Sequence, residues 1–250
     1  MNIEIYGTGE RMRTLASLAR EISVPHLLLL PIPTAKDKVH ITKTDLELSE
    51  TLTGVGEGSV VVGYDIPMWY TEKARSLGAR VLDLIFDGEF MGDNAYTTSL
   101  GALSYIMNSE KRQITDLSFG IVGYGRIGSR LTELLLFFGA RVRVYTSREE
   151  TALELCRCGV LADDGIYRGE FSAEGMDILI NTAPCDLSGA FLGKSLPDSF
   201  RIIELASGEN FDGVDRVERL PALPDRYYPE SAARAYLRAV KRFISGGDGK

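Results

Sequence analysis

The chain has 250 residues, of which 44% are hydrophobic and 25% charged, and its formal net charge is -7. This length allows one large domain or two smaller ones, and the composition is typical of a globular protein with a sizeable core. The excess of acidic residues excludes the basic surface that binding to nucleic acid or to an anionic membrane requires.

The chain has three cysteines, Cys156, Cys158 and Cys185. An odd and small number argues against a disulfide framework and for a reducing compartment. No further Cys or His cluster accompanies them, so we expect no metal site. The first residues lack the apolar segment of a signal peptide, and the apolar run at 26–33 is too short to span a bilayer. We therefore expect a cytoplasmic protein.

Short apolar strands alternate with helical segments over the first third of the chain. The pattern predicts helices at residues 11–22, 45–52 and 67–77, and strands at 3–6, 27–30, 60–62 and 81–84. This alternation is typical of a small, mostly parallel sheet that is covered on both faces. We expect a flavodoxin-like α/β domain of residues 1–93, completed by a C-terminal helix at 229–245.

A second and cleaner β/α series begins at Leu117, after a linking helix that is predicted from Asn94 to Met107 within residues 94–111. A helix with a capping box of Ser147 and Glu150 follows its second strand. The strands of this series are predicted at 117–122, 141–145, 160–162, 177–180, 202–205 and 217–220. The series predicts a doubly wound, parallel-sheet domain over residues 112–225.

Gly123, Gly125 and Gly128 lie in the segment GYGRIG, between the first strand of this series and an amphipathic helix. In a dinucleotide-binding βαβ unit, such glycines allow a tight turn, close approach to a pyrophosphate and close packing of the helix. Arg126 and Ile127 would open the helix, whose N-terminus attracts phosphate. The sequence therefore predicts a Rossmann-type dinucleotide site. The alternative is a glycine-rich turn without a ligand.

The end of the next strand distinguishes the two nicotinamide cofactors. An NAD site has an acidic residue there, which binds the ribose 2′-hydroxyl. This chain has Thr146, Ser147 and Arg148 instead, and a hydroxyl pair with a guanidinium suits a 2′-phosphate. We therefore predict NADP(H), with NAD(H) as the alternative if Arg148 is only a solvated residue of the following helix.

Two later strand ends are expected to reach the same cofactor, because ligands of open α/β sheets bind at the carboxyl ends of the strands. Their small residues and proline suit the close approach of a flat ring, although ordinary turns have a similar composition. The residues are Thr182, Ala183 and Pro184 after one strand, and Ala206 and Ser207 after the next.

The chain has two histidines, His26 and His40, and both precede the linking helix. The two-part layout is similar to that of 2-hydroxyacid dehydrogenases, which need a general base with a pKa near neutrality, usually histidine. That base is missing after residue 40. We expect another group to accept the proton, and our candidates are Tyr64 and Asp65, which follow a buried strand.

Asn94 and Thr98 lie one turn apart at the predicted start of the linking helix, and Ser231 opens the last helix. At a helix N-terminus, these side chains could bind a substrate carboxylate. Asn94 and Ser231 could equally be N-caps and nothing more. Arg11 follows the first strand and could bind an anion, or be an ordinary exposed arginine.

Several segments resemble the family of the dipicolinate synthase A chain, and together they cover most of the sequence. NAYTTSLG at 94–101 is similar to the family's Asn-x-x-x-Thr-x-Glu-Gly, and ALPDRYYPESAA at 222–233 is similar to its Gly-Leu-Pro-Gly and Ala-Pro-x-Thr-Ala-Gly segment. The glycine turn, INTAP at 180–184 and ELAS at 204–207 also match. The chain has Leu100 and Asp225 where the family pattern has Glu and Gly.

The resemblance implies an oxidoreductase that converts a dihydropyridine dicarboxylate into pyridine-2,6-dicarboxylate during sporulation, with a small flavoprotein-like partner subunit. Loss of a hydride from a dihydropyridine creates an aromatic ring, so a weak proton acceptor or water suffices. Two alternatives remain open: a non-catalytic dinucleotide-binding protein that acts as a sensor or a partner of an enzyme, and another NAD(P)-dependent dehydrogenase of a small carboxylate. Exposed apolar helix faces would suit a homodimer.

Overall fold

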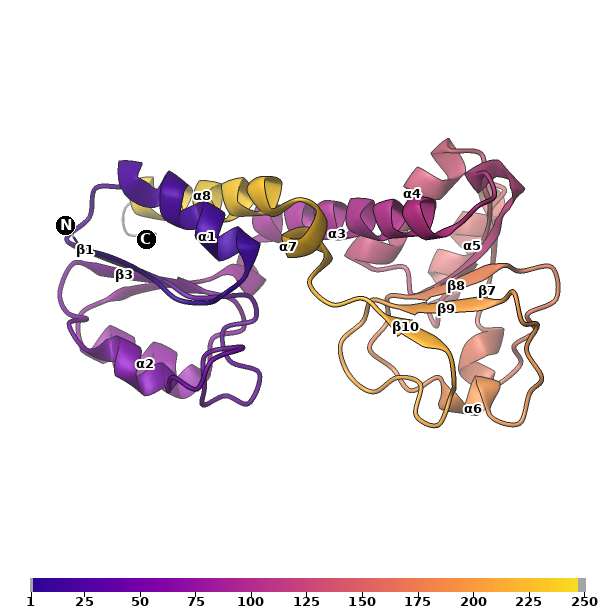
Figure 1. Cartoon of the computed structure of the whole chain (residues 1–250), viewed down its shortest axis with the longest axis horizontal. Helices are drawn as coiled ribbons and strands as arrows, with labels where there is room; N and C mark the ends of the chain where they lie inside the picture. The colour runs from indigo at the N-terminus through magenta and orange to yellow at the C-terminus, as the bar shows by residue number, and fades with distance from the viewer. Residues whose placement is uncertain (1, 247–250) are drawn as a thin grey trace. The chain divides into compact units, whose positions relative to one another are not determined.

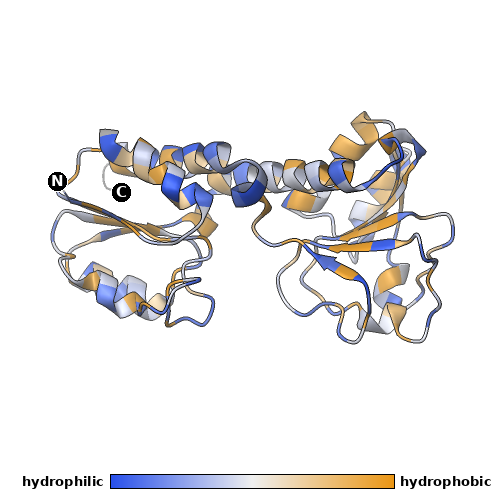
Figure 2. Cartoon of the chain, in the orientation of Figure 1, coloured by the Kyte–Doolittle hydropathy of each residue, from blue (hydrophilic) through white to orange (hydrophobic). Residues whose placement is uncertain are grey.

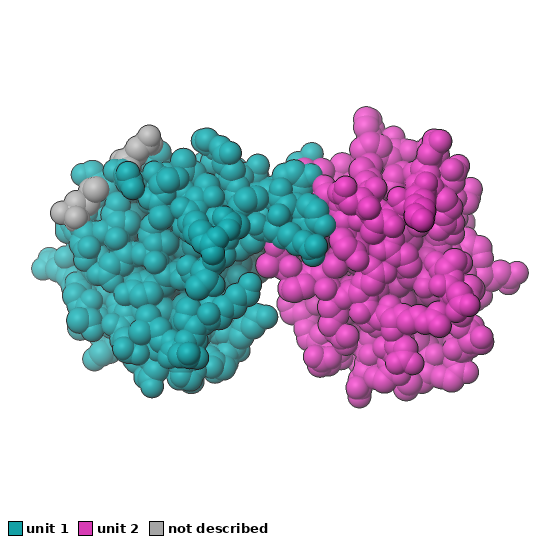
Figure 3. Space-filling view, viewed as in Figure 1, with its two compact units in different colours: residues 1–97, 224–250 teal, residues 98–223 magenta. Residues whose placement is uncertain are grey.

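The computed structural model describes residues 2–246, apart from the side chain of Glu21. The chain divides into two compact units. Unit 1 comprises Met1–Thr97 and Pro224–Lys250, and unit 2 comprises Thr98–Leu223 (Figure 3). Among the described residues, no helix is both long and apolar enough to span a membrane.

Unit 1 contains a parallel sheet of four strands in the order β1-β2-β3-β4. The strands are β1 (Asn2–Ile5), β2 (His26–Leu29), β3 (Ser59–Gly63) and β4 (Arg80–Asp83). A flavodoxin-like sheet would have its first strand inside, in the order 2-1-3. Here β1 pairs with β2 alone and forms the edge of the sheet, so the predicted small parallel α/β domain is confirmed, while its strand order differs from that of flavodoxin.

Both faces of the unit 1 sheet are covered, because successive strand residues point to opposite faces. Leu27 and Leu29 pack under α1 (Glu10–Leu18) and α8 (Pro229–Ser245). Leu28 and Leu30 pack on the opposite side with α2 (Met68–Ser76) and with the 3-10 helix η2 (Leu48–Leu52), as Figure 1 shows for α2. The helix predicted at 45–52 is thus a short 3-10 helix, begun by a capping box of Glu47 and Glu50.

The helix α3 runs from Gly88 to Ser109, so it begins well before Asn94, where the sequence predicts its start. Asp87 accepts the N–H of Phe90 through Oδ1 at 2.8 Å and so satisfies one donor of the first turn. Asn94 is therefore inside the helix and is not an N-cap. Residues 88–97 of α3 belong to unit 1, and the remainder belongs to unit 2.

Unit 2 contains a parallel sheet of six strands in the order β10-β9-β8-β5-β6-β7. This is the doubly wound order 3-2-1-4-5-6 of the Rossmann fold, and it confirms the predicted doubly wound, parallel-sheet domain. The strands are β5 (Ser118–Val122), β6 (Arg141–Tyr145), β7 (Leu161–Asp163), β8 (Ile178–Asn181), β9 (Arg201–Glu204) and β10 (Val217–Arg219). The helices that follow them are α4 (Arg126–Phe137), α5 (Glu149–Arg157) and α6 (Ser188–Phe191), and α7 (Leu223–Tyr227) leads into unit 1.

Figure 2 colours much of α4 as hydrophobic, and Leu131 and Leu135 of this helix are buried. An aromatic cluster covers the face of the unit 2 sheet opposite to α4. Phe171 lies at its centre, with ring centroids 4.8 Å from Phe191, 5.9 Å from Phe200 and 6.0 Å from Tyr145. This packing fixes the sheet whose carboxyl edge carries the glycine turn.

Candidate functional site

The glycine turn joins the end of β5 to the start of α4, and each of its glycines has a different structural reason. Gly123 has φ +87°, a conformation that side chains disfavour. A Cβ atom on Gly128 would lie 2.0 Å from the carbonyl oxygen of Gly123, so only glycine lets the helix start this close to the strand. A Cβ atom on Gly125 would meet nothing within 4 Å, so open space lies beside it.

The start of α4 fits a pyrophosphate. Gly125 is the N-cap residue and gives no side-chain cap, so the first N–H groups of the helix keep their capacity to bind an anion. Arg126 is exposed in the first turn and adds a positive charge there, and Ile127 is half-buried beside it. The open space at Gly125, the uncapped helix and Arg126 together fit the diphosphate of a dinucleotide.

Three residues follow β6 at the same edge. Thr146 is buried, and its Oγ1 accepts the N–H of Arg148 at 3.3 Å. Nη2 of Arg148 donates to the carbonyl oxygen of Tyr124, in the glycine turn, at 2.6 Å. Ser147 is exposed. Arg148 itself is the N-cap residue of α5 and no side chain caps this helix, so the predicted capping box of Ser147 and Glu150 was wrong.

The segments after β8 and β9 reach this carboxyl edge as well. Thr182 donates through Oγ1 to the carbonyl oxygen of Val122 at 2.8 Å, which ties its segment to the end of β5. A Cβ atom on Gly123 would lie 3.0 Å from the Cβ of Ala183. Pro184 and Ser207 are exposed, and Ala206 is half-buried. The sequence-predicted cofactor residues are thus on strand ends of one sheet edge.

A buried carboxylate joins the segments after β8 and β9, and the sequence alone assigns it no function. Glu204 ends β9 and is 4% exposed. It accepts the N–H of Ala206 at 2.8 Å and side-chain amide N–H groups of Asn181 at 3.1 Å and Asn210 at 3.3 Å. Burial raises the pKa of Glu204, and these hydrogen bonds oppose that rise. The signal available in the sequence was an acidic residue at the end of an otherwise apolar strand.

In unit 1, the two candidate proton acceptors follow β3 at the carboxyl edge of the sheet. Tyr64 is half-buried, with its ring centroid 6.4 Å from that of Phe90. Asp65 is exposed, has φ +53°, and lies 2.7 Å from Nζ of Lys38 through Oδ2. The backbone N–H of Asp65 is bound by Oδ1 of Asp83 at 2.9 Å. The Asp65 carboxylate is thus held in a defined place.

Of the predicted substrate residues, Ser231 lies at a helix start and Asn94 and Thr98 do not. Asn94 and Thr98 lie inside α3, so the expected help from its N-terminus is absent, because helix-terminal effects fade beyond the first turn. Ser231 is exposed in the first turn of α8, where Tyr228 is the N-cap residue. Asn94 does contact Arg11, whose Nη2 donates to Asn94 Oδ1 at 3.3 Å.

Arg11 is 3% exposed, so its interpretation as an exposed arginine was wrong. Its Nε lies 2.7 Å from Oδ1 of Asp225. The partner on α7 is far away in the sequence, which explains why the sequence alone does not predict this burial.

His26 lies away from the carboxyl edge of the unit 1 sheet, whereas His40 lies in the segment that follows the carboxyl end of β2. His26 is the first residue of β2, at the amino edge, where Nδ1 lies 3.1 Å from the carbonyl oxygen of Gly54. His40 is exposed and pairs through Nδ1 with Asp37 at 2.7 Å, an interaction that raises the pKa of His40.

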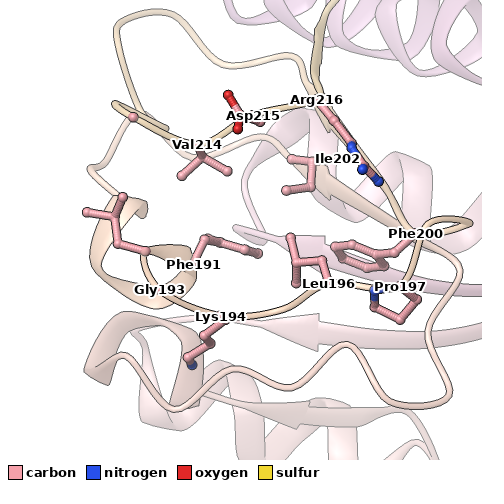
Figure 4. A pocket seen from close by; sticks show the side chains of 12 residues that line it. Phe191, Gly193, Lys194, Leu196, Pro197, Phe200, Ile202, Val214, Asp215 and Arg216 are labelled. Atoms are coloured by element: carbon pink, nitrogen blue, oxygen red, sulfur yellow. The ribbon is translucent and has the colours of Figure 1, made fainter.

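A cavity of about 270 Å³ in unit 2 lies at the opposite edge from the glycine turn (Figure 4). Phe200 and Ile202 line it near the amino end of β9, whereas the cofactor residues follow carboxyl ends. The ammonium of Lys194 on its wall already donates to the carbonyl oxygens of Gly169 and Phe171, each at 2.9 Å. The cavity is therefore separate from the predicted dinucleotide site.

No family model matches the chain, and no curated protein matches its sequence. Solved structures do match. The A chain of dipicolinate synthase from Bacillus halodurans is 17% identical with a TM-score of 0.73, over 99% of this chain and 98% of that one. The A chain of dipicolinate synthase from Bacillus subtilis is 15% identical with a TM-score of 0.77, over 98% and 96%.

A D-isomer specific 2-hydroxyacid dehydrogenase from Lactobacillus delbrueckii ssp. bulgaricus, in its NAD-complexed form, is 14% identical. Its TM-score is 0.52, over 100% of this chain and 99% of that one. At such identities the likeness concerns the fold. The resemblance to the A chain of dipicolinate synthase is confirmed at that level, and the protein has the Rossmann-type α/β fold that these dehydrogenases share.

Proposed function

We propose that the protein is an NADP-dependent oxidoreductase, similar to the A chain of dipicolinate synthase, that oxidises a dihydropyridine dicarboxylate by hydride transfer. The observation that carries the proposal is the carboxyl edge of the unit 2 sheet. There the open space at Gly125, the uncapped start of α4 and the residues after β6 form a cradle for a dinucleotide. The fold similarity to two dipicolinate synthase structures supports the substrate class.

The preference for NADP rests on charge at the end of β6. A 2′-phosphate adds about two negative charges, which favour a guanidinium and hydroxyl groups over a carboxylate. Arg148 begins α5 with its guanidinium beside the glycine turn, and Thr146 and Ser147 precede it. Glu149 and Glu150 follow in the first turn of α5 and are exposed. NAD(H) remains the alternative cofactor.

The proposed reaction makes a small demand on the protein for proton transfer. When bound, the nicotinamide ring of the oxidised cofactor accepts the hydride. The dihydropyridine also loses one proton and becomes an aromatic pyridine. We propose Asp65 as the acceptor of that proton, directly or through water, with Tyr64 beside it. The ammonium of Lys38 lies 2.7 Å from Oδ2 of Asp65 and orients the carboxylate.

The same proposal includes a cytoplasmic location, a homodimer and a small flavoprotein-like partner. The formal net charge of -7 agrees with the expected absence of nucleic acid as a partner.

The test is a fluorescence titration with NADPH and with NADH, followed by an absorbance assay of NADP⁺ reduction with freshly prepared dihydrodipicolinate. We expect tighter binding of NADPH and turnover of the dicarboxylate. Preference for NADH would contradict the cofactor assignment, and turnover of a 2-hydroxy acid but not of dihydrodipicolinate would contradict the substrate.

A non-catalytic dinucleotide sensor is the second candidate, and one observation favours it. The carboxylate of Asp65 is already paired with the ammonium of Lys38 at 2.7 Å. A sensor predicts tight NADPH binding without turnover, even in the presence of the flavoprotein-like partner.

A further inference from the structure

Arg11 is a buried cation of unit 1. It lies in the first turn of α1, after the segment Gly7-Thr8-Gly9 that leaves β1, and only 3% of it is exposed. Burial lowers its pKa, which shows that desolvation of the guanidinium is the largest influence on it. A buried arginine is usually held by a full set of acceptors, because an unpaired buried charge is strongly unfavourable.

Arg11 lacks that full set among residues 2–246. Asp225 lies 2.7 Å from Nε, and Asn94 accepts from Nη2 at 3.3 Å. Nη1 is buried and has no hydrogen-bond acceptor in this part of the chain, and Nε–H does not meet hydrogen-bond geometry towards Asp225 despite the short ion pair. One side of the guanidinium therefore faces Asp225 and Asn94, while the side that carries Nη1 is without an acceptor from the described residues.

The groups around Arg11 are already engaged elsewhere. The hydroxyl of Tyr236, which acts electrostatically on Arg11, lies at 2.9 Å from the carbonyl oxygens of both Leu30 and Val62, at the ends of β2 and β3. The helix α1 begins at Gly9 without a side-chain cap. Nη1, which has no acceptor among the described residues, thus occurs together with a helix start that has no side-chain cap, and the Asp225 carboxylate lies beside Gly9. This is the carboxyl edge of the sheet, where α/β proteins bind ligands.

We propose that Arg11, positioned by Asp225 and assisted by Asn94, binds one carboxylate group of a small-molecule ligand at the carboxyl edge of the unit 1 sheet. A planar carboxylate matches the fork of a guanidinium. The Nη1 side of the Arg11 guanidinium has no acceptor among the described residues. The proposal rests on the proposed function for one point only, which is that this ligand is the substrate. Arg11 replaces Thr98 and Ser231 as the principal substrate-binding residue.

Charge decides for a carboxylate over a phosphate. Arg11 and Asp225 together are neutral, and the Asp225 side chain is 25% exposed at the same place. A dianionic phosphate would be repelled by Asp225 more strongly than a single carboxylate group. Asp225 fixes the guanidinium and at the same time limits the negative charge that the site accepts.

The test is isothermal titration calorimetry of the full chain with pyridine-2,6-dicarboxylate, pyridine and inorganic phosphate, each with and without NADPH. We expect the dicarboxylate to bind, and pyridine and phosphate to bind at least about tenfold more weakly, as loss of a charged hydrogen-bonded contact predicts. Arg11→Lys should weaken the dicarboxylate by about tenfold or more, because an ammonium lacks the planar fork. Arg13→Lys, an exposed change on the same helix, is the matched control.

Asp225→Asn distinguishes a ligand-binding Arg11 from one with a purely structural role. It keeps the shape of the side chain, removes the negative charge, and should tighten dicarboxylate binding several-fold. The proposal would be overturned if the original protein did not bind the dicarboxylate, or if Arg11→Lys bound it as tightly as the original protein. Weaker or unchanged binding in Asp225→Asn would overturn it as well. NADPH binding without dicarboxylate binding would leave the cofactor part of the proposed function standing. Dicarboxylate binding without NADPH binding would support the role of Arg11 and contradict the cofactor part of the proposed function.

Discussion

Arg148 donates from Nη2 to the carbonyl oxygen of Tyr124 at 2.6 Å, which joins the residue that opens α5 to the turn that opens α4. The two parts of the proposed dinucleotide cradle, one assigned to the pyrophosphate and one to the adenosine ribose, are thereby held together. The guanidinium is placed beside the turn by the protein itself, so less side-chain freedom remains to be lost when a phosphate binds.

Arg148→Ala should weaken NADPH binding by about tenfold or more while NADH binding changes little, because only NADPH carries the 2′-phosphate. Fluorescence titrations of both cofactors measure this. Arg130→Ala removes the same charge from an exposed position on α4, where Arg130 pairs with Glu133, and should leave both affinities unchanged. If Arg148→Ala lowered the affinity for NADPH and NADH equally, the guanidinium would only stabilise the glycine turn and would not bind the 2′-phosphate.

Gly125→Ala should leave the fold intact and weaken both cofactors strongly. The added Cβ meets no protein atom within 4 Å, so it enters the space that we assign to the pyrophosphate. Thermal unfolding should therefore change little, within about 1 kcal/mol for the altered N-cap, while NADPH and NADH affinities fall together. Unchanged affinity would place the pyrophosphate elsewhere.

Gly128→Ala, in contrast to Gly125→Ala, should mainly reduce the stability of the fold. Its Cβ would lie 2.0 Å from the carbonyl oxygen of Gly123, and neither backbone segment can move away without disturbing β5 or α4. We expect a loss of at least about 1–3 kcal/mol in the free energy of unfolding, as for overpacked cores. Urea denaturation measures it, and a variant as stable as Gly125→Ala would contradict the close approach.

The doubly wound class of unit 2 and the position of the glycine turn could be predicted from the sequence, because they depend on local patterns. A strand, three spaced glycines and an amphipathic helix are contiguous at 117–138. The start of α3 was not predicted, because Gly88 and Gly92 have low helix propensity. In the structure, Asp87 stabilises this start by accepting the N–H of Phe90.

Long-range pairing explains what the sequence could not predict in the site. Arg11 is buried because α7 brings Asp225 to it, and no local pattern near residue 11 indicates that partner. The network around Glu204 has the same origin, since Asn181 comes from a neighbouring strand. The edge position of β1 likewise depends on which strand it pairs with, and alternation of strands and helices does not specify that.

Phe171→Ala should reduce the free energy of unfolding of unit 2 by about 3–5 kcal/mol, the usual cost of a deleted core aromatic ring. Phe171 is 5% exposed and touches the rings of Tyr145, Phe191 and Phe200. Phe137→Ala, whose side chain is 85% exposed at the end of α4, should change stability by less than about 0.5 kcal/mol. Urea denaturation monitored by circular dichroism compares the two; similar losses would contradict the assigned core.

Glu204 should make stability depend on pH in a defined direction. Burial raises its pKa in the folded chain above the ordinary value of 4.5, so the folded state binds a proton more tightly than the unfolded state does. Its contribution is therefore most favourable below about pH 4.5 and is lost as the pH rises through the raised pKa.

Glu204→Gln removes this titration while the other carboxylates remain. The free energy of unfolding of the original protein minus that of the variant should accordingly fall between about pH 4 and the raised pKa, and then stay constant. Urea denaturation at a series of pH values gives this difference. A difference that grows with pH would mean that the hydrogen bonds from Asn181, Ala206 and Asn210 outweigh burial and lower the pKa of Glu204.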